Sequence, residues 1–217
     1  MKKMISLMLV LVLFLTSGLL AFAAAEGDDN VFVFEFEDLS FEGRKGAGLS
    51  GASNGIAMIL CGNSEDLDIP EDFQPSNDYY VSYTYSVNSY DFEIESTVET
   101  DVKITLRLNS EIGVIEYNKT AFAIEVNGEV LDYKPFSVYP LQNTNGVTDS
   151  HYFTDYTLSV KAHLVAGANT ISVKTLDNVL LNGSNFAAPQ LDCMKLRPDD
   201  AGAVLTFTNK VEGNYDE

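Results

Sequence analysis

The chain has 217 residues, and its 32 acidic side chains outnumber 13 lysines and arginines, so its formal net charge is −19 at pH 7. A charge of this sign repels phosphate backbones and anionic membrane surfaces, which disfavours a nucleic-acid-binding or peripheral membrane role. The two cysteines, Cys61 and Cys193, are too few for a disulfide scaffold. Their apolar neighbours predict buried free thiols, with a disulfide between them as the alternative.

Residues 1–25 have the pattern of a secretory signal peptide. Lys2 and Lys3 precede a largely apolar run, and small residues follow up to the expected cleavage points at Ala23 and Ala25. Removing this segment leaves 11 basic and 32 acidic residues, a net charge of −21. We therefore predict a secreted, extracellular protein without membrane insertion after cleavage, in which residues 26–30 form a short linker.

Period-two alternation dominates the rest of the chain. Phe32, Phe34 and Phe36 share one face of the first predicted strand, whereas Glu35 and Glu37 share the other. Similar alternation follows over residues 90–95, 102–108, 122–126 and 156–160, and an apolar run covers residues 56–61. These patterns predict an all-β fold, a two-sheet antiparallel β-sandwich of the jelly-roll type.

Turn signals and strand order complete this prediction. Asn127-Gly128 is the strongest hairpin-turn signal, and Gly167 and Asn169 mark a second turn that leads into a strand. We expect the first strand, at residues 31–38, to lie beside the strand at residues 189–196, because the first and last strands of compact sandwiches often pair.

Five segments in this order resemble carbohydrate-binding modules of families 6 and 35. They are residues 34–38 (FEFED), 49–55 (LSGASNG), 123–128 (AIEVNG), 164–171 (LVAGANTI) and 189–192 (PQLD). The resemblance covers residues 31–197 and implies a calcium-stabilised, galactose-binding-like jelly roll that binds polysaccharide or glycan and is not an enzyme. Residues 198–217 are left as an acidic C-terminal tail, in which residues 204–208 are a candidate added strand.

The resemblance places a structural calcium site at Glu35, Glu37 and Asp192. Carboxylate oxygens are the ligands that calcium prefers. Acids two apart on one strand project the same way about 6 to 7 Å apart, so a twist or a loop must complete the shell. The alternative is a solvated acidic face.

Glycan binding is predicted at the loop end of the sandwich. Tyr156 and Asn185 are the main candidates, and Phe186 and Tyr152 are further ones. A sugar needs an aromatic platform for its C–H face and an amide for its hydroxyl groups. Family members usually carry tryptophan near the position of Tyr156, and this chain has none. Alternatively, Tyr156 packs inward with Leu158 and Val160, Asn185 is a turn residue and Phe186 fills the edge of the core.

Two other functions remain open at this point. Paired acids also occur in β-sandwich glycoside hydrolases and lyases. A surface rich in tyrosine and asparagine equally suits an adhesive protein with a protein partner at the cell surface. Residues 51–55 match the Gly-x-Ser-x-Gly pattern of serine hydrolases, but that pattern requires a strand before the serine and a helix after it, whereas a loop and a strand are predicted here.

Overall fold

The computed structural model describes residues 30–40, 58–61, 71–77, 79–82, 84, 88–110, 113–140, 152–176, 179–181 and 185–211. For residues 58–61, 88, 179–181 and 185–187 only the backbone is described. The predicted signal peptide and all of the predicted linker except Asn30 lie outside these ranges. In the described part of the chain, no helix is long and apolar enough to cross a membrane.

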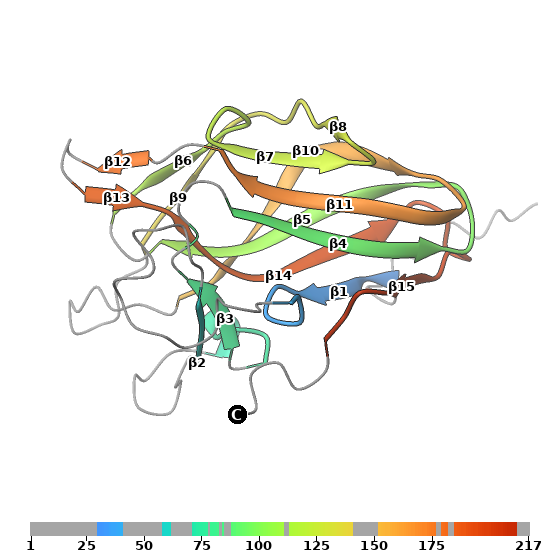
Figure 1. The fold of residues 1–217 in the computed structure, drawn as a ribbon, viewed down its shortest axis with the longest axis horizontal. Coiled ribbons are helices and arrows are strands. Elements are labelled where there is room, and N and C mark those ends of the chain that lie inside the picture. The colour runs from blue at the N-terminus through green and yellow to red at the C-terminus, as the bar shows by residue number, and fades with distance from the viewer. Residues whose placement is uncertain are drawn as a thin grey trace, which may run out of the picture. The chain divides into compact units, whose positions relative to one another are not determined.

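Two antiparallel sheets form the fold of the described residues between 31 and 211 (Figure 1). The larger sheet contains β1 (Phe32–Glu35), β2 (Met58–Cys61), β3 (Tyr79–Ser82), β5 (Thr100–Ser110), β10 (Thr154–Leu164) and β14 (Pro189–Pro198). The second sheet contains β4 (Asn88–Ser96), β7 (Phe122–Val126), β8 (Glu129–Val130), β11 (Gly167–Thr175) and β15 (Leu205–Phe207). The predicted all-β, two-sheet antiparallel sandwich is confirmed.

Smaller elements lie outside the two sheets. β6 (Ile115–Tyr117) pairs with β9 (Phe136–Val138), β12 (Val179–Leu181) pairs with β13 (Asn185–Ala187), and Glu71–Phe73 form a short 3₁₀ helix, η4. Pro189 at the start of β14 pairs with Ser110 at the end of β5. β13 runs into β14 and β6 follows β5, so both two-stranded sheets lie at the same end of the sandwich.

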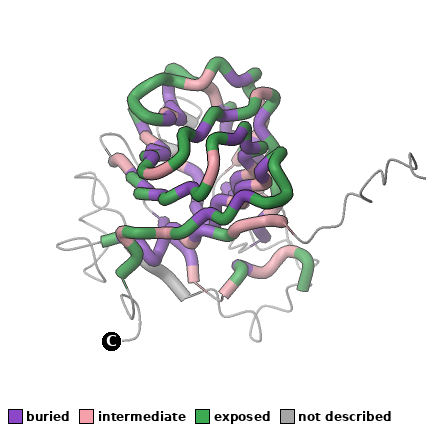
Figure 2. Tube along the Cα trace, turned by 90° about the vertical axis from the view of Figure 1, so that its right-hand side faces the viewer, coloured by how far each residue is buried: buried purple, intermediate pink, exposed green. Residues whose placement is uncertain are grey.

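Alternating burial packs the two sheets against each other. Along β5, the even-numbered residues from Val102 to Leu108 are buried, and the odd-numbered residues from Asp101 to Arg107 point to the outer face. Figure 2 shows the same alternation of buried and exposed positions along other strands. Apolar residues of both sheets form one core, which includes Phe34, Leu106, Phe92 and Ile124. Period-two patterning therefore determines which face of each strand meets the other sheet.

The first strand and the penultimate one are neighbours, as predicted. β1 pairs antiparallel with β14, with Phe34 opposite Met194 and Glu35 opposite Cys193. The Asn127-Gly128 turn is also present: both residues have positive φ, 52° and 85°, as a tight type I′ turn between β7 and β8 requires.

The segment predicted as a tail continues the sandwich. Leu205–Phe207 form β15, which pairs with β4 at the edge of the second sheet. Beyond this strand, Lys210 forms an ion pair with Asp38, 2.7 Å between Nζ and Oδ2. The described chain thus crosses from the larger sheet to the second one after Pro198 and returns to the turn that follows β1.

Candidate functional site

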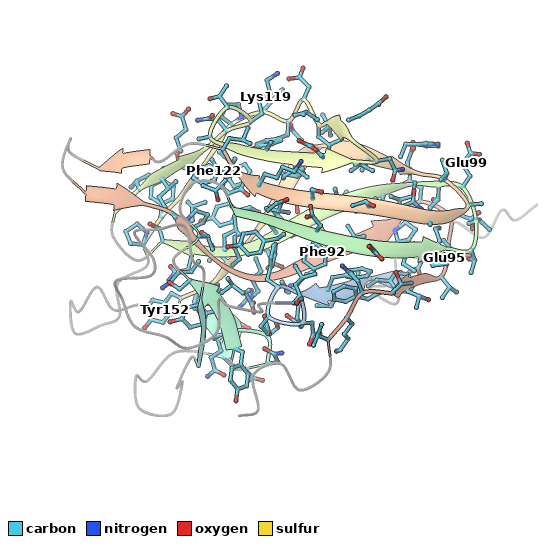
Figure 3. The ribbon with its side chains drawn as sticks, viewed as in Figure 1. Phe92, Glu95, Glu99, Lys119, Phe122 and Tyr152 are labelled. Carbon is cyan, nitrogen blue, oxygen red and sulfur yellow. The ribbon has the colours of Figure 1, made fainter. Side chains whose placement is uncertain are left out.

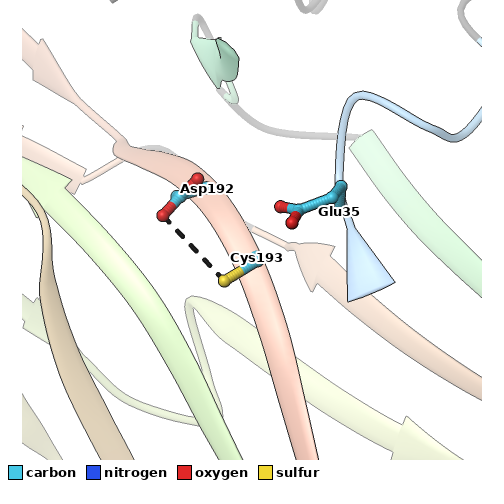
Figure 4. A group of neighbouring side chains, drawn as sticks. All are labelled: Glu35, Asp192 and Cys193. Carbon is cyan, nitrogen blue, oxygen red and sulfur yellow. Dashed lines mark hydrogen bonds between the residues drawn. The ribbon is translucent and has the colours of Figure 1, made fainter. Parts of the chain in front are cut away.

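A cluster of acidic side chains forms where β1 meets β14 (Figure 4). β14 carries two residues, Asp192 and Cys193, where its neighbour β5 has only Arg107, because the register shifts between Leu191 and Met194. Such a bulge redirects side chains. Ligand atoms of Glu35, Asp192 and Cys193 consequently lie within 4.8 Å of one another.

A turn after β1 places two more acids near this cluster. It is closed by the backbone hydrogen bond from Leu39 N to Phe36 O, 3.2 Å long, while Phe36 N donates to Asp192 O at 3.1 Å. The turn contains Glu37, which is 0% exposed, and Asp38, which is 3% exposed. Asp38 Oδ1 is buried without a hydrogen-bond partner among the described residues.

Ser76 and Arg107 hold the carboxylates of the cluster. Ser76 Oγ lies 2.7 Å from Glu35 Oε2 and 2.9 Å from Asp192 Oδ1, and Ser76 N donates to the same Asp192 oxygen at 3.0 Å. Arg107 Nε lies 2.9 Å from Asp192 Oδ2. A serine hydroxyl has one hydrogen to donate, so it cannot satisfy two ionised carboxylates at once. Its hydrogen can therefore go to only one of Glu35 and Asp192 at a time, and Asp192 also accepts from Ser76 N and Arg107 Nε.

Burial makes negative charge unfavourable at this place. Desolvation raises the pKa of Glu35 to about 7 and that of Asp192 to about 6. Desolvation, followed by the charge of Glu35, raises the pKa of Glu37 to about 9. Burial also raises the pKa of the Cys193 thiol well above its usual range, and this cysteine is free and fully buried, as predicted.

These raised pKa values predict the pH dependence of the metal-free protein. A carboxyl group with a higher pKa in the folded state than in the unfolded state binds more protons when folded, so its stabilising effect is complete below about pH 4 and is lost as the pH rises. The free energy of unfolding should fall between pH 4 and pH 9, by about 1.4 kcal/mol for each tenfold difference in proton affinity between the two states. Urea unfolding in the presence of a chelator measures this change.

Glu37→Gln should flatten this pH profile, because glutamine resembles the protonated acid. The exposed Glu129, on β8, gives a matched control in Glu129→Gln. Equal pH slopes for Glu37→Gln and the wild-type protein would contradict the prediction.

The donor set of the cluster fits a hard cation. Glu35, Glu37 and Asp192 offer carboxylate oxygens and Ser76 offers a hydroxyl group, which are the ligand types that calcium takes. The protonated Cys193 thiol is a soft donor and does not suit that ion. The predicted calcium ligands Glu35 and Asp192 lie together, and Glu37 is close enough for their charges to raise its pKa.

Tyr156 ends a stack of four aromatic rings. Its ring stacks on Phe136, with centroids 5.1 Å apart. Phe136 stacks on Tyr117 at 5.0 Å, and Tyr117 stacks on Phe122 at 4.5 Å. Tyr156 is half-buried and lies on the face of β10 that also carries Leu158, so its ring packs partly inward.

Tyr139 is an exposed aromatic residue that sequence reasoning missed. It follows β9, it is 53% exposed, and its backbone N–H donates to Tyr156 Oη at 3.3 Å. An aromatic residue directly after a short strand and before Pro140 is too weak a signal to select it from the sequence. Tyr139 and Tyr156 together bring two aromatic residues to one end of the sandwich.

The other predicted glycan-binding residues have different environments. Tyr152, which is labelled in Figure 3, is 6% exposed. It packs edge-on against Phe73, so little of its ring is open to a ligand. Asn185 and Phe186 lie on β13, at the same end of the sandwich as β9, and their side chains lie outside the described residues. The part played by all four predicted residues in binding stays a prediction.

Similar solved structures include both isolated modules and enzymes. A family 35 carbohydrate-binding module from Clostridium thermocellum is 18% identical, with a TM-score of 0.46 over 76% of this chain and 98% of that one. The GH26-CBM35 β-(1,4)-mannanase of Podospora anserina is 16% identical, with a TM-score of 0.47 over 79% of this chain and 28% of the mannanase. An exo-β-1,3-galactanase from Phanerochaete chrysosporium is 17% identical, with a TM-score of 0.45 over 76% of this chain and 29% of the enzyme.

Family 35 modules recur among these similar structures, whereas the family 6 alternative is not confirmed. No protein-family model and no curated protein matches the chain. All TM-scores given above are below 0.5, so the function proposed below rests on this chain's own residues.

Proposed function

We propose that the protein is a secreted, non-catalytic carbohydrate-binding module that binds a glycan at the end of the sandwich carrying β6, β9 and β13. The observation that carries this proposal is the pair of Tyr139 and Tyr156. Tyr139 is 53% exposed, and the stack behind Tyr156 fixes the orientation of the Tyr156 ring. A pre-oriented ring binds the C–H face of a sugar with little loss of side-chain entropy.

Calcium has a structural role in this proposal. Glu35, Glu37 and Asp192 would hold the ion, and its positive charge would offset the repulsion between their carboxylates. The resulting link between the turn after β1 and the bulge of β14 would stabilise the sandwich at neutral pH.

The burial of the acid cluster argues against a glycoside hydrolase. A catalytic pair of acids has to reach a glycosidic bond from both sides. Asp192 is 0% exposed and is already engaged by Arg107 and Ser76. A carboxylate in this position supports a structural role rather than a catalytic one.

A glycan array followed by calorimetry on the glycans that bind tests the proposal. Tyr139→Ala and Tyr156→Ala should each weaken binding about tenfold or more, because aromatic anchors dominate such interfaces. Tyr156→Phe keeps the ring and should bind nearly as well as the wild type. The exposed Leu176 gives a matched control in Leu176→Ala.

Two outcomes would overturn this proposal. Folded Tyr139→Ala and Tyr156→Ala variants that bind as tightly as the wild type would show that the site is elsewhere. Absence of binding to every glycan, with and without calcium, would favour the adhesive alternative.

A further inference from the structure

Basic side chains gather on the outer face of the larger sheet, opposite to the core. Lys103 of β5 lies directly between Lys161 of β10 and Arg197 of β14 in the strand register. Lys195 lies one position further along the same face of β14, opposite Thr105. We name Lys103, Lys161, Lys195 and Arg197 the basic face.

This concentration of positive charge contrasts with the rest of the molecule. The whole chain has 13 lysines and arginines and a net charge of −19. Neighbouring acids pair with two members of the basic face: Lys161 Nζ lies 2.6 Å from Asp199 Oδ2, and Lys195 Nζ lies 2.7 Å from Asp155 Oδ2. These pairs engage Lys161 and Lys195 and leave the centre of the face without an ion pair among the described residues, although Asp101 and Asp199 lie one position further along the same face.

Lys103 and Arg197 form that centre. Neither has an ion-pair partner among the described residues, although they lie directly opposite each other on adjacent strands. Like charges in such positions destabilise a sheet. A bound anion between them would remove this repulsion, and Arg197 can bind a carboxylate or sulfate group through two parallel hydrogen bonds.

Hydroxyl groups lie next to these cations. Thr105 and Thr157 are cross-strand partners whose Oγ1 atoms are 2.8 Å apart at the surface. The adjacent exposed Val33, opposite Lys195, adds a small apolar patch. Cations, hydroxyl groups and an apolar side chain on one sheet face match the charged groups, hydroxyl groups and C–H surface of an acidic sugar.

We propose that the basic face binds an acidic polysaccharide through its carboxylate or sulfate groups. This proposal rests on the function proposed above in one respect, namely that the bound anionic group belongs to a glycan. The basic face is distinct from the glycan site proposed at Tyr139 and Tyr156, because Lys161 points outward from β10 whereas Tyr156 packs towards the core.

Binding of the mature protein to polygalacturonate and to heparin, measured against fully methyl-esterified polygalacturonate and desulfated heparin, tests the proposal. The double variant Lys103→Gln/Arg197→Gln should weaken binding to an acidic polymer about tenfold or more and reduce its salt dependence. The control variant Lys119→Gln/Lys134→Gln removes the same charge from other exposed positions and should bind like the wild type.

Three outcomes would overturn the proposal. The first is equal affinity of the protein for the charged and the neutralised polymers. The second is an equal loss of affinity in both double variants. The third is self-association of the protein at low salt that requires Lys103 and Arg197, without binding of any acidic polymer. The last outcome would assign the basic face to a second copy, whose exposed Asp91, Glu93 and Glu95 on β4 supply the complementary charge. If Tyr139→Ala and Tyr156→Ala change only the binding of neutral glycans, that result tests the function proposed above and not the basic face.

Discussion

Calcium is expected to raise the melting temperature of the protein at pH 7 by about 5 to 10 °C. A ligand at a hundredfold excess over its Kd adds about 2.7 kcal/mol to the free energy of unfolding. For a domain of this size, each kcal/mol shifts the melting temperature by about 2 to 4 °C. Thermal unfolding with calcium chloride and with a chelator measures the difference.

Asp192→Asn should abolish this calcium response, because it removes a charged ligand while nearly keeping the size of the side chain. The exposed acid Glu129 again supplies the control, and Glu129→Gln should respond to calcium like the wild type. Identical melting curves for the wild-type protein in calcium and in chelator would show that the acid cluster of β1 and β14 holds no structural calcium.

The largest effect of a single substitution is expected for Phe92→Ala, with a loss of about 3 to 5 kcal/mol in the free energy of unfolding. Phe92 of β4, which is labelled in Figure 3, is 0% exposed. Its ring centroid lies 5.0 Å from that of Phe36 and 5.4 Å from that of Phe207. Removing it leaves a cavity between the two sheets, lined by residues of the turn after β1, β4 and β15.

Chemical denaturation measures this loss, and Tyr139→Ala, at an exposed position, should change the free energy of unfolding by less than about 0.5 kcal/mol. A loss below about 1 kcal/mol for Phe92→Ala would mean that this ring does not join the two sheets. Because typical domains are stable by only about 5 to 15 kcal/mol, the expected loss is a large part of the total.

The sandwich itself was predictable because its signals are local. Alternation in residues 102–108 determines which face of β5 is buried, whatever its neighbours are. Asn127-Gly128 specifies its turn through the positive φ that both residues adopt. The pairing of β1 with β14 was predicted from a general rule about first and last strands, because no residue pattern in either strand indicates its partner.

The acid cluster was predictable only in part. Glu35 and Asp192 were selected through the family resemblance, and the structure brings them together. Ser76 was missed because it lies 116 residues from Asp192, in an irregular segment without a periodic pattern. Arg107 was missed because a period-two pattern does not indicate where a bulge occurs, and the bulge of β14 brings Asp192 to Arg107.

The aromatic end of the sandwich illustrates a similar limit. Tyr156 alternates with polar residues, which equally fits an inward-facing and a ligand-binding ring. The structure gives it a half-buried position between the core and Tyr139. This position depends on β9, whose three residues, Phe136–Val138, are too few to reveal a period.

The pairing of β1 with β14 affects how the chain can be made. Phe34 is synthesised 160 residues before its partner Met194. At roughly 5 to 20 residues per second, about 10 to 30 s pass before that partner leaves the ribosome. During this time the phenylalanine-rich first strand has no partner, and an open strand edge is a template for aggregation. A chain that terminates before residue 189 lacks β14, so β1 never gains its partner strand. Such truncated chains should be more prone to aggregate than the complete protein.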